Sequence, residues 1–276
     1  MPAVLALLAA LSWGLADFLG GALSRKFPTA LVMLWSAFAG LFAIGVVLAL
    51  GAWERPGAYL LWGLGAGFVG LAATVLFYRA LALGTMSIVA PIAGTGLVVP
   101  VLAGLLDGER PSALALLGIV FAAVGVFLAS GPEMKAEGVQ RTSVTYAIGA
   151  AFGFGITLAL IPQAGEGRWA MTSATIMLVA VVVLLPYVYL VAPSSPGFAR
   201  SSPAPVFGIG LLNVTALSLY AVSSTRGLVA VVSVLASLYP VVTVVLAQVV
   251  LRERLKGIQR YGVAAAFAGV VCLAAG

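Results

Sequence analysis

The chain has 276 residues, of which 63% are hydrophobic and 8% are charged, and its formal net charge at pH 7 is +6. A water-soluble domain carries about 25% charged residues, so this chain has too little charge to cover a soluble surface. Its long apolar runs must face lipid, which makes it a polytopic membrane protein with the bilayer as its main partner. The 14 lysines and arginines are scattered over short loops, so we expect no nucleic-acid partner.

The residue content also limits the chemistry. The chain contains no histidine and a single cysteine, Cys272. Zinc sites and cysteine–histidine nucleophiles need those residue types, so we expect no metal, no cofactor and no catalytic residue. The phosphate-binding pattern Gly-x-x-x-x-Gly-Lys-Ser/Thr is absent from the sequence. Any transport must therefore be driven by a gradient or by exchange.

Runs of about 17–25 mostly apolar residues, bounded by proline, glycine or charge, predict transmembrane helices. In chain order these runs are Ala3–Leu23, Thr29–Leu50, Ala58–Leu83, Met86–Leu106, Ser112–Ser130, Ser143–Ile161, Ala170–Val191, Val206–Ser224, Leu228–Leu251 and Ile258–Ala275. Several of the links between them are very short, so consecutive helices should be antiparallel neighbours in one bundle. The predicted fold class is an all-α membrane protein with ten transmembrane helices.

The second half of the chain repeats landmarks of the first. Three landmarks recur at an offset of 144 residues: Glu109 with Glu253, Gly118 with Gly262, and Gly125 with Gly269. Each copy holds five predicted spans, and an odd number makes the second copy enter the membrane from the opposite side. We therefore predict two inverted five-helix repeats, residues 1–138 and 139–276, that form one integral membrane domain. Inverted repeats are typical of secondary transporters, whose substrate site lies near the midplane between the halves.

Three groups of residues give the chain a family resemblance. They are the segment Ala10–Gly21 (ALSWGLADFLGG), the spaced residues Tyr78, Ala82, Gly84 and Ala90–Ile92, and the two Glu-Arg landmarks followed by glycine. Together with the repeat, they resemble the EamA type of the drug/metabolite transporter superfamily over essentially the whole chain. The resemblance implies export or exchange of small metabolites, including amino acids, through a central cavity. Gly96 and Leu97 stand where the second repeat has Tyr239 and Pro240, so the helix kinks of the two halves need not match.

Asp17 and Arg79 are the charged residues that fall clearly inside predicted spans. An ionisable side chain at the centre of a membrane helix costs at least about 2.5–3.5 kcal/mol, so each should face the bundle interior or reach an interface. In one hypothesis Asp17 faces the central cavity and binds and releases a coupling proton. In another it pairs with Arg79, and in the third Arg79 extends to the interface while Asp17 only contacts a neighbouring helix.

Neutral side chains complete the predicted site. Trp13, Tyr78 and Tyr220 lie in the spans that carry the family-like motifs, and Thr74, Asn213 and Ser237 offer hydrogen-bonding groups. We predict that these residues, with Asp17 and Arg79, bind a small amphiphilic metabolite. The alternative for each hydroxyl is an interhelical hydrogen bond, and Asn213 can likewise bridge helices.

Two loop pairs, Glu109–Arg110 and Glu253–Arg254, lie next to span ends. They are either solvated pairs that fix helix ends or a gate that opens and closes with access, and exposed ion pairs are individually weak. With a cytoplasmic N-terminus, the cytoplasmic loops would hold 4 basic residues against 10 on the other side. The positive-inside rule therefore favours both termini outside the cytoplasm, whereas the family resemblance favours cytoplasmic termini.

The predicted function is a secondary transporter of the cell membrane that moves a small organic metabolite by alternating access. One alternative is an integral membrane enzyme acting on a lipid-linked substrate, but such chemistry usually needs convergent acids, histidine or a metal. The other is a channel or a non-transporting scaffold, and the sequence shows neither rings of charge nor a filter loop.

Overall fold

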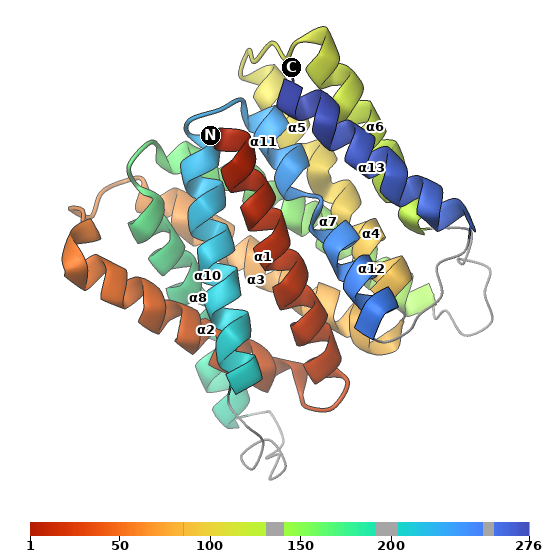
Figure 1. Ribbon diagram of the computed structural model, residues 1–276. Coiled ribbons are helices and arrows are strands. Elements are labelled where there is room, and N and C mark those ends of the chain that lie inside the picture. Colours follow the sequence, from red (N-terminus) through yellow and green to blue (C-terminus); the bar gives the residue numbers. More distant parts are fainter. Residues whose placement is uncertain (85, 131–140, 191–203, 251–256, 276) are drawn as a thin grey trace.

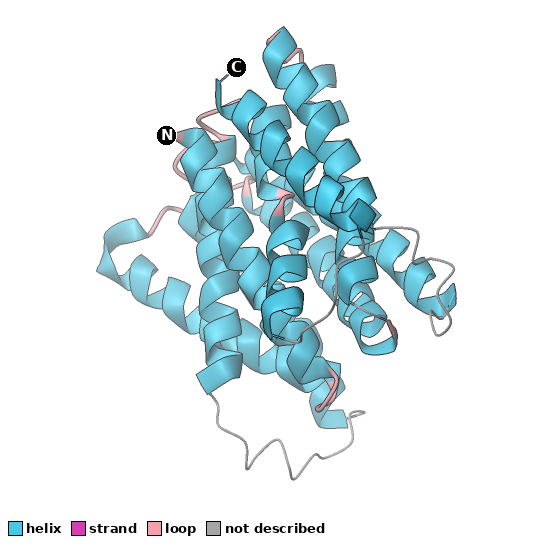
Figure 2. Cartoon of the chain, turned by 45° about the vertical axis from the view of Figure 1, so that its right-hand side comes forward, coloured by secondary structure: helices cyan, strands magenta, loops and turns pink. Residues whose placement is uncertain are grey.

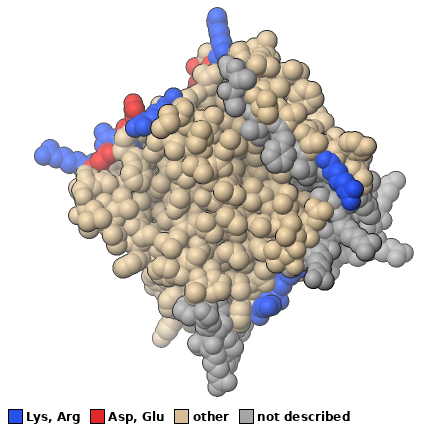
Figure 3. Space-filling model, in the orientation of Figure 1, with Lys and Arg blue, Asp and Glu red and all other residues tan. Residues whose placement is uncertain are grey.

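The computed structural model describes residues 1–84, 86–130, 141–190, 204–250 and 257–275, and the regular structure in these ranges is helical. The helices pack into one bundle (Figure 1), and the view turned by 45° shows the same arrangement (Figure 2). The face in Figure 3 is a broad uncharged band with charged side chains at its edges, as expected for a surface that meets lipid. The prediction of an all-α membrane protein is confirmed for the described residues.

The first half contains α1 (Pro2–Ser24), α2 (Thr29–Val47) with a π-helical end (Leu48–Ala52), α3 (Leu60–Leu83), α4 (Met86–Gly94), a 3-10 turn (Thr95–Leu97), α5 (Val98–Leu106) and α6 (Ala113–Ser130). The second half contains α7 (Arg141–Leu160) with a 3-10 turn (Ile161–Ala164), α8 (Trp169–Leu190), α10 (Ala204–Ser224), α11 (Val229–Ala236), α12 (Tyr239–Val250) and α13 (Gly257–Ala275). Every predicted apolar run overlaps one helix or a consecutive pair.

Seven helical segments in the described ranges are long and apolar enough to cross a membrane on their own. The runs Ile92–Leu106 and Ala113–Gly125 are shorter apolar helices. The count of ten spans therefore stays a prediction. The predicted boundary between the repeats, at residues 138 and 139, lies outside the described residues, as does the Glu253–Arg254 pair.

The fourth apolar run of each half is broken near its middle. In the first half a 3-10 turn at Thr95–Leu97 separates α4 from α5, and in the second half Ser237 and Leu238 separate α11 from α12. Proline follows each break, as Pro100 in α5 and as Pro240 in the first turn of α12, where a missing N–H is tolerated. The sequence does not require the kinks of the two halves to match, but the breaks lie at corresponding places.

Contacts between the halves show the same correspondence. By their order in each half, α1 is equivalent to α7 and α3 is equivalent to α10. Helix α3 packs on α7, and α10 packs on α1, so each contact becomes the other when the halves are exchanged. The contacts of α2 with α10 and of α3 with α8 form a second exchanged pair, while α2 with α8 and α6 with α13 are pairs of equivalent helices. Exchanging the halves therefore leaves the pattern of packing unchanged, which is the signature of an approximate two-fold relation.

Glycine allows the closest of these contacts, because the helix backbones approach without side chains between them. A β-carbon built on Gly96 would lie 2.0 Å from the carbonyl oxygen of Ala151, and one built on Gly155 would meet the carbonyl oxygen of Gly96. At the α6–α13 contact, a β-carbon on Gly118 would lie 2.9 Å from the carbonyl oxygen of Gly269. The α4–α5 break is thus held directly against the backbone of α7.

Candidate functional site

A cavity of about 150 Å³ lies between the two halves of the bundle. Its wall comes from α1, α2 and α3 of the first half and from α7, α8, α10 and α12 of the second. The polar and aromatic residues of the wall are Trp13, Asp17, Ser36, Thr74, Tyr78, Phe154, Thr157, Asn213 and Tyr239. Glycine and aliphatic residues, including Met33 and Met177, form the rest. A mostly apolar cavity with a few polar groups is the usual form of a small-molecule site.

Helical spacing brings the polar residues of this wall together. Trp13 and Asp17 are four residues apart on α1, and Thr74 and Tyr78 are four residues apart on α3, so each pair shares one face of its helix. Asn213 reaches the same cavity from α10. Five of the eight residues predicted to form the site, namely Trp13, Asp17, Thr74, Tyr78 and Asn213, therefore line one cavity.

Asp17 is buried, with 9% of its surface exposed. The ion pairs of the described residues involve other acids, so the Asp17 carboxylate has no basic partner there. Arg79 is exposed, and the predicted alternative in which it pairs with Asp17 is not formed. Tyr78 and Tyr239 line the same cavity as Asp17.

Tyr78 packs closely against α1, and its side chain lines the same cavity as Asn213 of α10. Its hydroxyl lies against Gly20 of α1, where an added β-carbon would come within 2.2 Å of the phenolic oxygen. Only glycine leaves room there for the ring, so Gly20 fixes how closely Tyr78 approaches α1.

Aromatic rings form a continuous series beside the cavity. The centroids of Trp13 and Tyr239 are 6.5 Å apart, and those of Tyr239 and Phe154 are 6.4 Å apart, both in edge-to-face arrangements. Phe154 in turn contacts Phe77 at 5.6 Å, and Trp13 contacts Tyr220 at 5.9 Å. Edge-to-face packing of this kind adds about 0.5–1.5 kcal/mol per pair beyond the burial of apolar area.

Three residues predicted for the site do not line the cavity: Arg79, Tyr220 and Ser237. Tyr220 is fully buried and its hydroxyl donates to the carbonyl oxygen of Leu158 at 2.7 Å, and it also lies 2.7 Å from the hydroxyl of Ser233. These contacts join α10 to α7 and α11. Ser237 is buried at the end of α11, where its N–H donates to the carbonyl oxygen of Ser233.

The buried hydrogen bond of the Tyr220 hydroxyl should stabilise the fold, and this can be tested. Changing Tyr220 to Phe leaves the Leu158 carbonyl without its donor, and an unsatisfied buried polar group costs about 1–3 kcal/mol. We expect Tyr220→Phe to lower the thermal unfolding temperature in detergent, whereas Tyr187→Phe, at an exposed position of α8, leaves it unchanged. Equal unfolding temperatures for the two variants would show that the buried hydrogen bond contributes no stability.

The sequence-based prediction missed several wall residues. Tyr239 and Phe154 supply two of the aromatic rings, and Ser36 and Thr157 supply hydroxyls. Tyr239 had a signal in the sequence, since it directly precedes Pro240. Phe154 stands between Gly153 and Gly155, where the small neighbours leave its ring exposed to adjoining helices, but a phenylalanine in an apolar run is otherwise unremarkable.

Contacts at one face of the bundle join the two halves. We call it the N-terminal face, because α1 begins and α13 ends there (Figures 1 and 2). Glu54, after α2, pairs with Arg168, before α8, at 3.0 Å, and Arg168 also lies 4.6 Å from the ring centroid of Tyr59. Glu109, after α5, accepts hydrogen bonds from the N–H groups of Val229 and Ala230 at the start of α11.

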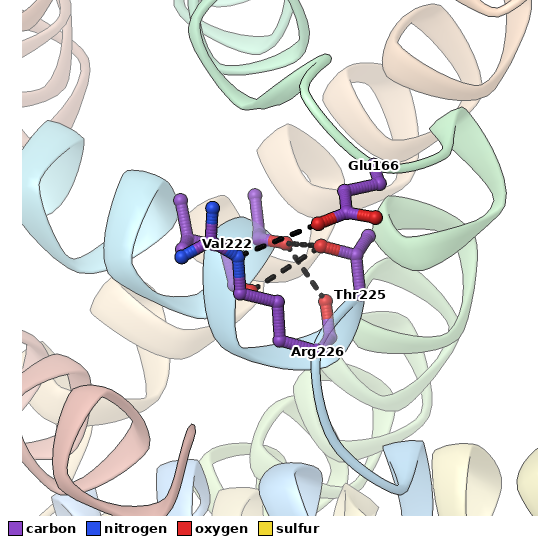
Figure 4. A network of polar contacts seen from close by, with 6 residues as sticks. Glu166, Val222, Thr225 and Arg226 are labelled. Carbon is purple, nitrogen blue, oxygen red and sulfur yellow. Dashed lines mark hydrogen bonds and ion pairs between the residues drawn. The ribbon is translucent and has the colours of Figure 1, made fainter. Parts of the chain in front are cut away.

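A second pair at this face lies within the second half. Figure 4 shows Glu166 beside Arg226, whose Nε is 3.6 Å from the Glu166 carboxylate. Next to it the Thr225 hydroxyl contacts the carbonyl oxygens of Ala221 and Val222 at 3.2 and 3.3 Å. Both charged side chains are more than half exposed, at 60% and 70%, so the pair contributes little stability. The contact of Glu109 with α11 is the better-buried link.

Comparison with known proteins agrees with this architecture. The model of the EamA-like transporter family matches residues 1–131 and again residues 141–275. A solved crystal structure of another protein has the same fold, with a TM-score of 0.76 and 20% sequence identity over 98% of this chain and 95% of that one. A comparison with curated proteins finds no match. Because the two family matches cover nearly all of its residues, the chain is a two-repeat membrane protein of the EamA-like transporter family.

Proposed function

We propose that the protein is a secondary transporter of the cell membrane that moves a small organic metabolite by alternating access between two inverted halves. One observation carries the proposal: a single cavity is built from helices of both halves. A relative movement of the halves would then change the shape of the cavity and its access. The exchange symmetry of the interhelical contacts supports two equivalent halves, and with five predicted spans in each half the second one would be inverted.

The contacts at the N-terminal face support a closed gate on that side. Glu54 with Arg168, and Glu109 with the start of α11, each join one half to the other. The cavity wall includes Met33 near the start of α2 and Tyr78 near the end of α3, both close to the opposite face. We therefore propose that the described conformation is closed at the N-terminal face, and that transport requires these cross-half contacts to break.

The test uses the purified protein in lipid vesicles. Vesicles loaded with an unlabelled metabolite should accumulate the same labelled metabolite from outside, because a carrier exchanges one for the other. A panel of amino acids, amines, nucleobases and organic acids covers the chemical classes. A channel would equilibrate the label without such accumulation, a membrane enzyme would convert its substrate, and a scaffold would do neither. No accumulation with any member of a broad panel would contradict the proposal.

The role of a coupling proton has its own test. An acid–base side chain with no basic partner can take up and release a proton, and Asp17 is such a group in the cavity wall. We expect Asp17→Asn to abolish accumulation driven by an imposed proton gradient, because the amide cannot be ionised. Asp107→Asn makes the same change at an exposed position after α5 and should accumulate substrate normally. Gradient-driven accumulation by Asp17→Asn would exclude the residue as the proton carrier.

A further inference from the structure

The cavity contains an acid whose charge is not balanced by the protein. Asp17 is 9% exposed, and no lysine or arginine is among the described residues of the cavity wall. A buried carboxylate is stable when it is protonated or when a positive charge pairs with it. The described wall supplies no positive charge, so an ionised Asp17 would need to pair with a cation that enters the cavity.

The serine and threonine hydroxyls of the wall have already used their hydrogens. Ser36 donates to the carbonyl oxygen of Met33 at 3.0 Å, Thr74 to that of Gly70 at 2.8 Å, and Thr157 to that of Gly153 at 2.9 Å. Each hydroxyl has one donor and two acceptor lone pairs, so each retains acceptor capacity and no free donor. Carboxylate and hydroxyl oxygens together favour a ligand that brings hydrogen-bond donors.

The donors that remain in the wall are neutral. The Tyr239 hydroxyl is buried without a hydrogen-bond partner among the described residues, and Asn213 and Trp13 each carry N–H groups. A bound carboxylate usually needs an arginine or lysine, with which it forms the strongest hydrogen bonds. The described wall offers none, so an amino acid would bury its carboxylate unpaired and close to Asp17.

The remaining surface suits a compact apolar body. Trp13, Tyr239 and Phe154 present adjoining rings, and aromatic faces attract cations as well as apolar groups. The volume of about 150 Å³ is comparable with that of an engineered apolar cavity that binds benzene. The ligand is therefore about the size of one ring with a short side chain.

We propose that the cavity binds a small organic amine in its protonated form, with the ammonium group at Asp17 and the apolar body beside Trp13, Phe154 and Tyr239. This inference rests on the proposed function and narrows its substrate class from metabolites in general to amines without a carboxylate. It replaces the expectation of an amino acid, which the family resemblance supplied.

Four probes with nearly the same body and different charge test the proposal. They are 2-phenylethylamine, 2-phenylethanol, 3-phenylpropanoate and phenylalanine, each titrated into the purified protein in nanodiscs with calorimetry as the readout. A charge-assisted hydrogen bond is worth about 1.5–3 kcal/mol, so the amine should bind about tenfold or more tightly than the other three. Equal affinity for the alcohol, tighter binding of phenylalanine, or no binding of the amine at millimolar concentration would overturn the proposal.

Variants locate the preference at Asp17. In Asp17→Asn the affinity ratio of amine to alcohol should fall to about one, whereas Asp17→Glu should keep a preference for the amine. Asp107→Asn should behave as the unmodified protein, since that residue is outside the cavity wall. Each variant is first checked for a single melting transition, and the probe series on the unmodified protein decides the question if Asp17→Asn does not fold. A preference that persists in folded Asp17→Asn would contradict the assignment.

The outcome is separable from that of the proposed function. If the protein exchanges a neutral, anionic or zwitterionic metabolite in vesicles and shows no preference for amines, the proposed transport function is supported and the proposed amine site is contradicted. Asp17-dependent binding of the amine without exchange of any panel member would keep the site and remove the transporter.

Discussion

Replacing Gly96 with alanine is expected to destabilise the protein strongly. The new β-carbon would lie 2.0 Å from the carbonyl oxygen of Ala151 and 2.8 Å from its carbonyl carbon. A backbone carbonyl in α7 cannot rotate away as a side chain does, so the α4–α5 break must move away from α7 as a whole. Overpacking typically costs about 1–3 kcal/mol, and rigid backbone on both sides puts this site at the upper end.

The measurement is the thermal unfolding temperature in detergent, together with the monodisperse fraction in size-exclusion chromatography. The matched control is Gly45→Ala, also in a helix, where no atom lies within 4 Å of the added carbon. Alanine favours helix over glycine by about 0.5–1 kcal/mol, so the control should unfold at the same temperature or higher. If Gly96→Ala and Gly45→Ala unfold at the same temperature, the close contact between the α4–α5 break and α7 does not exist in the protein.

Changing Glu109 to Gln is expected to favour opening at the N-terminal face. Both carboxylate oxygens accept from N–H groups of α11, namely those of Val229 and Ala230, and a negative charge at a helix N-terminus adds about 0.3–2 kcal/mol. The amide keeps one acceptor oxygen and loses the charge. A loss of about 1.4 kcal/mol from the closed state would raise the relative population of the open state about tenfold.

The readout is labelling of a cysteine in the cavity wall from the N-terminal face. Leu217→Cys lies in the wall, and Cys272→Ala removes the sole native thiol. In vesicles of known orientation, an impermeant reagent added at the N-terminal face should react faster when Glu109→Gln is present. Glu166→Gln makes the same change in the exposed pair with Arg226 and should leave the rate unchanged. Equal labelling rates for the two variants would show that Glu109 does not hold the N-terminal face closed.

The sequence predicts the helices well because lipid imposes a simple rule on composition. An apolar run such as that containing Asp17 must be helical to satisfy its backbone, and a polar residue within it must turn inward. This rule favours Asp17, Thr74 and Asn213 as inward-facing residues, whereas Tyr78 is selected for its place in a family-like motif. It could not place Phe154, because an apolar ring is tolerated whether it faces lipid, a neighbouring helix or a cavity.

The position of a residue around and along its helix explains why some residues predicted for the cavity wall do not line it. Arg79 follows Tyr78 directly, and a step of one residue turns the side chain by about 100°, so the buried tyrosine places the arginine outward. Tyr220 lies on the same helix face as Asn213, seven residues or about two turns further along, and so lies beyond the end of the cavity. These positions depend on how far the cavity extends along each helix, which no residue pattern specifies.

The paired breaks in the fourth apolar runs have a mechanical consequence. Proline has no N–H, so the carbonyl of Gly96 cannot pair with residue 100, and the carbonyl of Ala236 cannot pair with Pro240. Bending a continuous helix stretches such bonds on its convex side, and at these two points one of the bonds that would resist bending is missing. Each half therefore bends more easily at its break than along an unbroken helix, and in the first half the contact of Gly96 with α7 sets the point about which such a bend would turn.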